Sequence, residues 1–217
     1  MIWIDHSRDF PAGSHALFSP SQPMWTMDKD EEDVFKRYRG SVAAKIGTVI
    51  HEEASECILT NTKYTKKEAV KVITKRLVLN GISRTAFDPD YLASNFVNYV
   101  NDAIGYNMRP EQALYYSKWC AGTADTILFD EKKKILRIHD LKTGVAPAKF
   151  LQLECYAALF FLEYGSMLGV SPSDTSIELR IFQGSEVKEE FPGPDVILPI
   201  MDSAIWHTQV MRSIEEG

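Results

Sequence analysis

The spacing of apolar residues divides the chain into a helical first half and a strand-rich second half. Apolar positions recur with a helical period near 29–39, 41–60, 65–80 and 88–106. Alternating runs then predict three strands near 111–119, 121–130 and 134–142. A buried helix at 148–164, a hairpin at 175–191 and a last helix at 194–215 follow. This order predicts an α/β or α+β fold in which a mixed central sheet is flanked by helices.

Composition is that of a compact globular protein. The 217 residues are 45% apolar and 25% charged, which suffices for one sizeable core. We therefore predict a single domain, with a helical N-terminal part at about 1–107 and a core at about 108–217. The three cysteines show no disulfide pattern, and the chain has no long apolar span. These features predict a cytoplasmic protein that does not enter a membrane.

Two acids and a lysine lie at the ends of two predicted neighbouring strands. Asp125 belongs to the strand at 121–130, and Asp140 and Lys142 end the strand at 134–142. Because side chains alternate along a strand, Asp140 and Lys142 share a face with apolar residues, opposite Arg137 and His139. Burying both charges is costly unless they pair or bind a metal. The pattern predicts a metal site beside a positive charge; the alternative is a surface ion pair on a solvated hairpin.

Three further elements surround this hairpin. Gln152 and Tyr156 are four residues apart on the predicted buried helix, so they lie on one helical face. Gly47, inside the helix at 41–60, suggests a close approach there, and the adjacent His51 could bind a metal through a neutral imidazole. A satisfied core glutamine and an ordinary surface or core histidine are the alternatives. Glu111 is either an accessory ligand or a surface glutamate.

In the order His51, Gly122-x-x-Asp125, Asp140-x-Lys142 and Gln152-x-x-x-Tyr156, these motifs resemble those of RecB-like nucleases of the PD-(D/E)XK superfamily. The segment His15–Ser21 is similar to the start of phage-encoded members. The resemblance spans roughly residues 15–190 and implies a restriction-endonuclease-like core beneath an N-terminal helical cap. It also implies a metal-dependent deoxyribonuclease, with an exonuclease of recombination, repair or phage replication favoured.

The resemblance implies a role for each residue. Asp125, Asp140, His51 and the Leu141 carbonyl would bind Mg²⁺ or Mn²⁺. Lys142 would orient or deprotonate the attacking water and stabilise the transition state. Gln152 and Tyr156 would position the DNA strand or the lysine. Trp25, Tyr115, Tyr116 and Trp119 could stack on bases, although core packing suits most of them better.

Cofactor and partner expectations follow. Some members of the family bind an iron–sulfur cluster through one N-terminal and three C-terminal cysteines, whereas Cys57, Cys120 and Cys155 all lie in the middle. We therefore predict no cluster. DNA, single- or double-stranded, is the expected partner despite a net charge of −6, and an oligomer is possible. If the chain is phage-encoded, it would act in the host cytoplasm. The alternative is a catalytically silent nucleic-acid-binding or assembly protein with the nuclease fold.

Overall fold

The computed structural model of the protein describes residues 26–216. The chain divides into two compact units, Met1–Lys45 and Ile46–Gly217. In the first unit, the Arg37 guanidinium pairs with both carboxylate oxygens of Asp28, at 2.9 and 2.5 Å. The second unit contains the sheet and every site residue considered below. The sequence expectations for His15–Ser21 and Trp25 lie outside the described residues.

Helices precede the sheet, as the apolar pattern predicts. They are α1 (Glu31–Leu59), α2 (Lys66–Leu79), the short 3-10 helix η2 (Arg84–Ala86) and α3 (Pro89–Tyr106). Two predicted helices, 29–39 and 41–60, are one helix, because α1 continues through Gly40. A glycine within a helix costs only about 1 kcal/mol, which the flanking helix formers outweigh. Asp88 begins α3 by accepting hydrogen bonds from the first turn, and Asn107 ends it in the left-handed conformation.

The second half alternates strands and helices. In chain order these are β1 (Arg109–Ser117), β2 (Cys120–Asp130), β3 (Ile135–Lys142), α4 (Leu151–Leu168), β4 (Ser176–Gln183), β5 (Glu186–Glu190) and α5 (Pro194–Glu216). The helix α4 begins three residues later than predicted and ends at Gly169, whose φ of 65° favours glycine. The other predicted strands and helices of this half are found within about two residues of their expected bounds.

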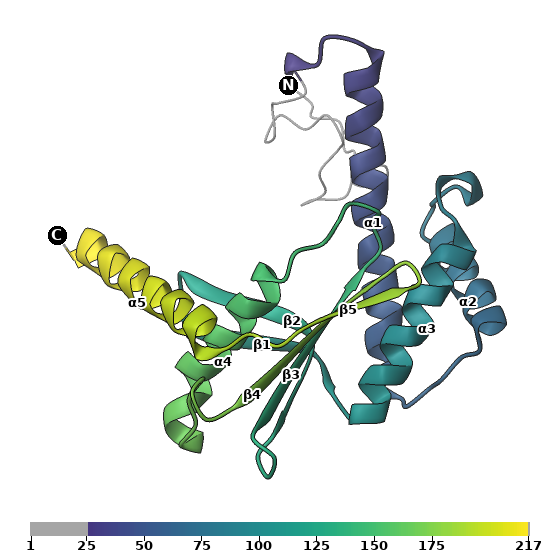
Figure 1. Ribbon diagram of the computed structural model, residues 1–217. Coiled ribbons are helices and arrows are strands. Elements are labelled where there is room, and N and C mark those ends of the chain that lie inside the picture. The colour runs from purple at the N-terminus through teal and green to yellow at the C-terminus, as the bar shows by residue number, and fades with distance from the viewer. Residues whose placement is uncertain (1–25, 217) are drawn as a thin grey trace, which may run out of the picture. The chain divides into compact units, whose positions relative to one another are not determined.

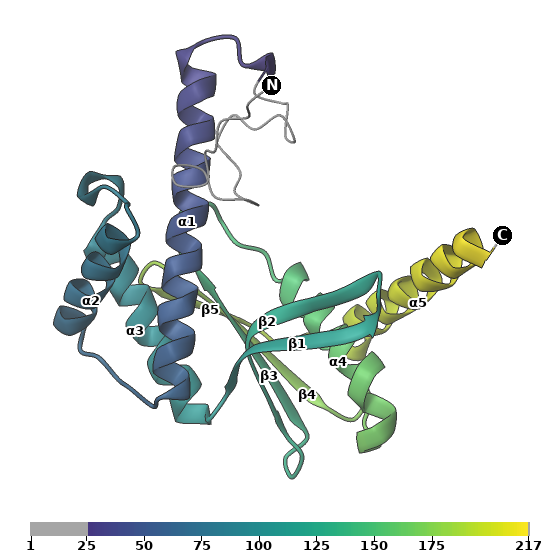
Figure 2. The same ribbon diagram turned by 180° about the vertical axis from the view of Figure 1, so that it is seen from behind.

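The five strands form one mixed sheet in the order β1-β2-β3-β4-β5. Neighbouring strands are antiparallel except for β3 and β4, which are parallel and are joined by α4 as the crossover helix. Figures 1 and 2 show α4 and α5 on one side of the sheet and α2 and α3 on the other. The fold is therefore α+β, with a mixed sheet flanked by helices, as the sequence predicts. Among the helices of residues 26–216, none has the length and apolarity needed to cross a membrane.

Apolar residues of β2, β3 and β4 pack against α4 to form the main core. Leu136, Ile138 and Leu179 are nearly inaccessible to solvent and belong to one buried cluster with Leu153 and Ala157 of the helix. Burial of such side chains contributes about 1.5–3 kcal/mol each. The pairing of β2 with β1 and with β3 positions the acidic residues.

Candidate metal centre

Strand pairing brings three acidic residues into one row across the sheet. Thr126 pairs with His139 and Ile127 with Ile138, so the next pair outward is Asp125 opposite Asp140. On the other side of β2, Glu111 falls between the pairs Pro110–Thr126 and Gln112–Ala124, again opposite Asp125. Glu111, Asp125 and Asp140 thus come from three adjacent strands.

Asp125 occupies the centre of this row and is held by the backbone. Its Oδ2 accepts a hydrogen bond from the Leu141 amide at 2.9 Å and lies 3.4 Å from His51 Nδ1. The Asp125 side chain is 15% exposed, so the carboxylate opens to solvent on one side while its position is set by β3. A carboxylate fixed in this way is a ready oxygen ligand for a hard cation.

His51 extends from α1 toward the same point. Its Nε2 lies 2.8 Å from the Leu141 carbonyl, which can only accept, so Nε2 carries the hydrogen. In the neutral ring, the Nδ1 lone pair then faces Asp125 Oδ2 at 3.4 Å, so that two hydrogen-bond acceptors lie opposite each other. That contact is favourable only with a proton or a cation between the two atoms. A histidine that donates one N–H to a carbonyl and presents the other nitrogen is the arrangement seen around protein-bound metals.

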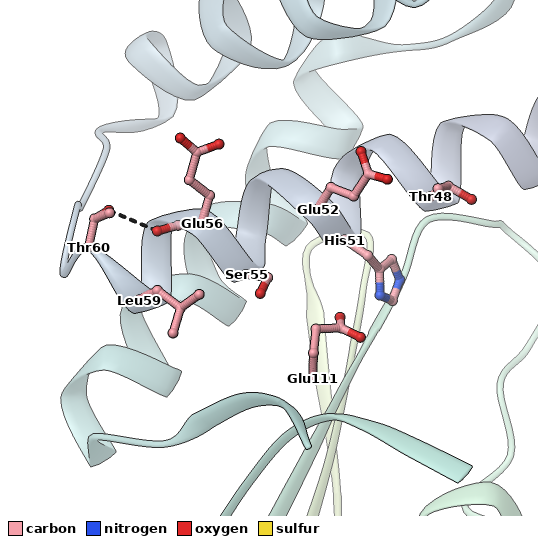
Figure 3. A pocket seen from close by; sticks show the side chains of 8 residues that line it. All are labelled: Thr48, His51, Glu52, Ser55, Glu56, Leu59, Thr60 and Glu111. Carbon is pink, nitrogen blue, oxygen red and sulfur yellow. Dashed lines mark hydrogen bonds between the residues drawn. The ribbon is translucent and has the colours of Figure 1, made fainter. Parts of the chain in front are cut away.

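Glu111 completes a three-residue cluster. One ligand atom each from His51, Glu111 and Asp125 lies within 4.8 Å of the others. Figure 3 shows the Glu111 and His51 side chains pointing toward one another from β1 and α1, at the end of a pocket of about 550 Å³ along α1. The φ of Glu111 is 49°, an unfavourable value for a residue with a Cβ. Glu111 as a whole is exposed to solvent, yet its carboxylate points into the cluster.

Negative charge in the cluster shifts the titration of its members. Burial and the charge of Asp125 raise the pKa of Glu111, and the same two causes raise the pKa of Asp140. Burial disfavours a charged His51, but the hydrogen bond and charge of Asp125, followed by the charge of Asp140, outweigh burial and raise its pKa. All three shifts have the direction expected where acidic groups crowd together without enough positive charge.

Asp140 is partly neutralised by Lys142. The lysine Nζ donates to Asp140 Oδ1 at 3.0 Å and to Gln152 Oε1 at 2.9 Å. The second carboxylate oxygen, Oδ2, is buried and has no hydrogen-bond partner among the described residues. An unsatisfied buried carboxylate oxygen is costly, so its place beside Asp125 fits a cation ligand.

Gln152 and Tyr156, the two residues from α4, have different contacts. Gln152 binds the Lys142 ammonium, as above. Tyr156 packs over Gly122: a Cβ added at Gly122 would lie 2.9 Å from Tyr156 Cε1. The glycine in the Gly-x-x-Asp motif is therefore explained by the tyrosine. Gly47 has no such explanation, because a Cβ there would meet Thr143 Oγ1 at 3.5 Å, an ordinary contact.

The structure thus gathers His51, Asp125, Asp140, Lys142 and the Leu141 carbonyl around one point, with Gln152 beside the lysine. It adds Glu111 to His51 and Asp125, whereas Asp140 lies outside that 4.8 Å group and engages Lys142. The His51 hydrogen bond uses one lone pair of the Leu141 carbonyl, which leaves a second. The sequence signal for Glu111 is its position at the start of the first predicted strand, within carboxylate reach of the predicted acidic edge.

Comparisons with protein-family models, with curated proteins and with solved structures gave no match to this chain.

Proposed function

We propose that the protein is a metal-dependent deoxyribonuclease that hydrolyses phosphodiester bonds at the cluster formed by His51, Glu111, Asp125 and Asp140. The observation that carries the proposal is the incomplete charge balance of this cluster: three carboxylates meet one ammonium, and a buried carboxylate oxygen has no partner in the described part of the chain. A bound cation would offset the burial and the repulsion that raise the pKa of Glu111 and of Asp140.

The available donors suit Mg²⁺ or Mn²⁺. Glu111, Asp125 and Asp140 Oδ2 offer the hard oxygen ligands that both ions prefer. His51 Nδ1 adds one nitrogen, which shifts the preference toward Mn²⁺. Bound there, the ion would lower the pKa of the attacking water and stabilise charge on the phosphate oxygens.

Lys142 supplies a second, fixed positive charge. Asp140 and Gln152 each hold its Nζ, and the side chain remains 32% exposed at the edge of the site. In hydrolysis, water attacks phosphorus and the bond from phosphorus to the departing sugar oxygen breaks, while negative charge grows on the phosphoryl oxygens. An ammonium held in place before the reaction stabilises that charge without reorganising.

DNA is proposed as the substrate on the order of the motifs. The sequence Gly122-x-x-Asp125, Asp140-x-Lys142 and Gln152-x-x-x-Tyr156 resembles RecB-like nucleases. The contacts between Gly122 and Tyr156, and between Lys142 and Gln152, support treating these motifs as one unit. An exonuclease is the form that the resemblance favours.

End-labelled DNA tests the proposal. Linear and circular substrates, single- and double-stranded, would be incubated with Mg²⁺, with Mn²⁺ or with EDTA. We expect shortening of linear DNA with either ion, no cleavage in EDTA, and no cleavage by Asp125→Asn. The matched control is Asp130→Asn, which alters an acid at the far end of the same strand and should cleave like the wild type. Wild-type cleavage in excess EDTA, or binding of DNA without cleavage under all metal conditions, would overturn the proposal.

A further inference from the structure

Gln152 and Tyr156 also line a second pocket, of about 570 Å³, that the metal centre does not use. It lies between the β1–β2 turn, α4 and α5. Trp119 and Gly122 contribute from the turn and β2, and Ser203, Ala204 and His207 contribute from α5. The volume is within the range of small-molecule sites. Because Gln152 binds Lys142 directly, one residue connects this pocket to the proposed phosphate position.

The walls of the pocket suit a flat, uncharged group. The rings of Trp119, Tyr156 and His207 line it, and the buried Ala158 and Leu159 contribute apolar surface. None of its described lining residues is an aspartate, glutamate, lysine or arginine. Aromatic walls with small residues between them favour stacking of a planar ring, and the lining supplies no charged side chain for a phosphate or a carboxylate.

His207 and Gln152 supply a hydrogen-bond acceptor and a hydrogen-bond donor among the lining residues. His207 Nδ1 lies 2.7 Å from the Ser203 carbonyl and must donate to it, so its Nε2 is an acceptor in the neutral ring. Gln152 gives its oxygen to Lys142, so its amide NH₂ serves as the donor. The His207 acceptor and the Gln152 donor, in a lining that also includes Ser203 and Thr208, match the edge of a nucleobase, which carries both.

We infer that this pocket receives a nucleobase of the strand whose phosphate is cleaved at Lys142. The inference rests on the proposed function for the identity of the strand, and it adds that the enzyme holds one base as well as the phosphate. Stacking between aromatic and apolar side chains is the usual way in which enzymes hold a single unpaired base.

Binding of mononucleotides in EDTA tests the pocket apart from metal and cleavage. Deoxyadenosine 5′-monophosphate, deoxyribose 5-phosphate and inorganic phosphate would each be titrated by ligand-observed NMR. We expect the nucleotide to bind, and the two ligands without a base to bind at least about tenfold more weakly. Trp119→Ala should weaken nucleotide binding by about 5- to 150-fold, the range for loss of one stacking partner.

Ala204→Phe provides a second test by filling the pocket from α5. It should abolish nucleotide binding while Gln209→Phe, on the same helix and outside the pocket lining, leaves it unchanged. Thermal melting of both variants checks that they fold. A Trp119→Ala variant that fails to fold leaves Ala204→Phe to decide the question.

Cleavage of DNA with one abasic residue at each successive position supplies an independent readout. Wild-type protein should slow at the position where the missing base would occupy the pocket, and Ala204→Phe should not distinguish that position. Equal affinity for deoxyadenosine 5′-monophosphate and deoxyribose 5-phosphate would overturn the inference even if DNA is cleaved. Base-dependent nucleotide binding without any DNA cleavage would instead overturn the proposed function and retain a nucleotide pocket.

Discussion

Strand β3 carries charged side chains on both faces, and the two sets are neutralised differently. On the α3 face, Arg137 Nε lies 2.6 Å from Glu178 Oε2, and Arg180 NH1 lies 2.7 Å from Asp102 Oδ2. Both guanidinium groups stack over the Tyr106 ring, at 4.4 and 5.3 Å from its centre. We call these five residues, with the buried His139 beside them, the paired cluster.

On the opposite face, the cluster of His51, Glu111, Asp125, Asp140 and Lys142 is not neutralised in the same way. We call it the acid cluster. Its one ammonium, that of Lys142, donates to Asp140 Oδ1. Burial, followed by the charge of Asp125, raises the pKa of Asp140 and of Glu111. Each arginine of the paired cluster has a carboxylate partner, whereas in the acid cluster Asp140 Oδ2 has no hydrogen-bond partner among the described residues. Buried charges that pair with one another, as in the paired cluster, belong to the fold, and crowded acids with raised pKa values, as in the acid cluster, are typical of a binding site.

The largest expected effect on stability is in the paired cluster. Arg137→Met leaves Glu178 without its partner beside the sheet, and removing one member of a buried ion pair costs about 3–5 kcal/mol. We expect a large fall in the urea midpoint, with metal affinity unchanged at temperatures where the variant is folded. The same substitution at an exposed pair, Lys133→Met, should change stability by less than about 1 kcal/mol.

Lys142→Ala should act mainly on the rate of cleavage. Losing a preorganised positive charge costs about 2.7–4 kcal/mol of transition-state stabilisation, or a hundred- to thousandfold in rate. We expect the variant to fold and to bind Mn²⁺ as the wild type does, because a protonated amine offers no lone pair. Single-turnover cleavage of DNA measures the rate. More than about a tenth of wild-type activity would make Lys142 only an ion-pair partner of Asp140.

His139 predicts how stability depends on pH. Burial, followed by the charges of Arg180 and Arg137, lowers its pKa to about 3 from the ordinary 6.5. In the unfolded chain His139 is protonated as the pH falls through 6.5, whereas in the folded chain it stays neutral down to about pH 3. The free energy of unfolding therefore decreases as the pH falls from 6.5 toward 3. Between pH 6.5 and 5 the loss attributable to this residue is about 1.6 kcal/mol. Urea unfolding at both pH values should show that His139→Phe removes this part of the slope; an unchanged slope would contradict a neutral buried His139.

The smallest effect concerns Gly122. Its substitution by alanine would bring a Cβ within 2.9 Å of Tyr156, and the ring edge must move. We expect a loss of about 1 kcal/mol in stability, together with a larger loss of cleavage as Tyr156 shifts beside Gln152. Gly105→Ala is the control, because nothing lies within 4 Å of a Cβ there. Equal effects of the two substitutions on cleavage would mean that Tyr156 has no positioning role.

Local pattern predicted the hairpin and its faces. Alternation placed Asp140 and Lys142 together and Arg137 and His139 opposite them, and the register of β2 and β3 agrees. The burial of Arg137 and His139 was not predictable, because their partners Asp102 and Glu178 come from α3 and β4, distant in sequence. Glu111 lies in the acid cluster with a φ of 49°, a conformation that its sequence neighbourhood does not predict. The continuity of α1 through Gly40 likewise depends on flanking residues that outweigh one unfavourable glycine.

Calorimetric titration of metal-free protein with Mn²⁺ tests most directly whether the acid cluster is a metal site. We expect saturable binding with at least one ion per chain, its loss in Asp125→Asn, and its retention in Lys142→Ala and in Arg137→Met on the far face of β3. Metal bound to folded protein should also raise the melting temperature of the wild type and not that of Asp125→Asn. Absence of Mn²⁺ binding by the wild type, or undiminished binding by Asp125→Asn, would contradict the assignment of this cluster as a metal centre.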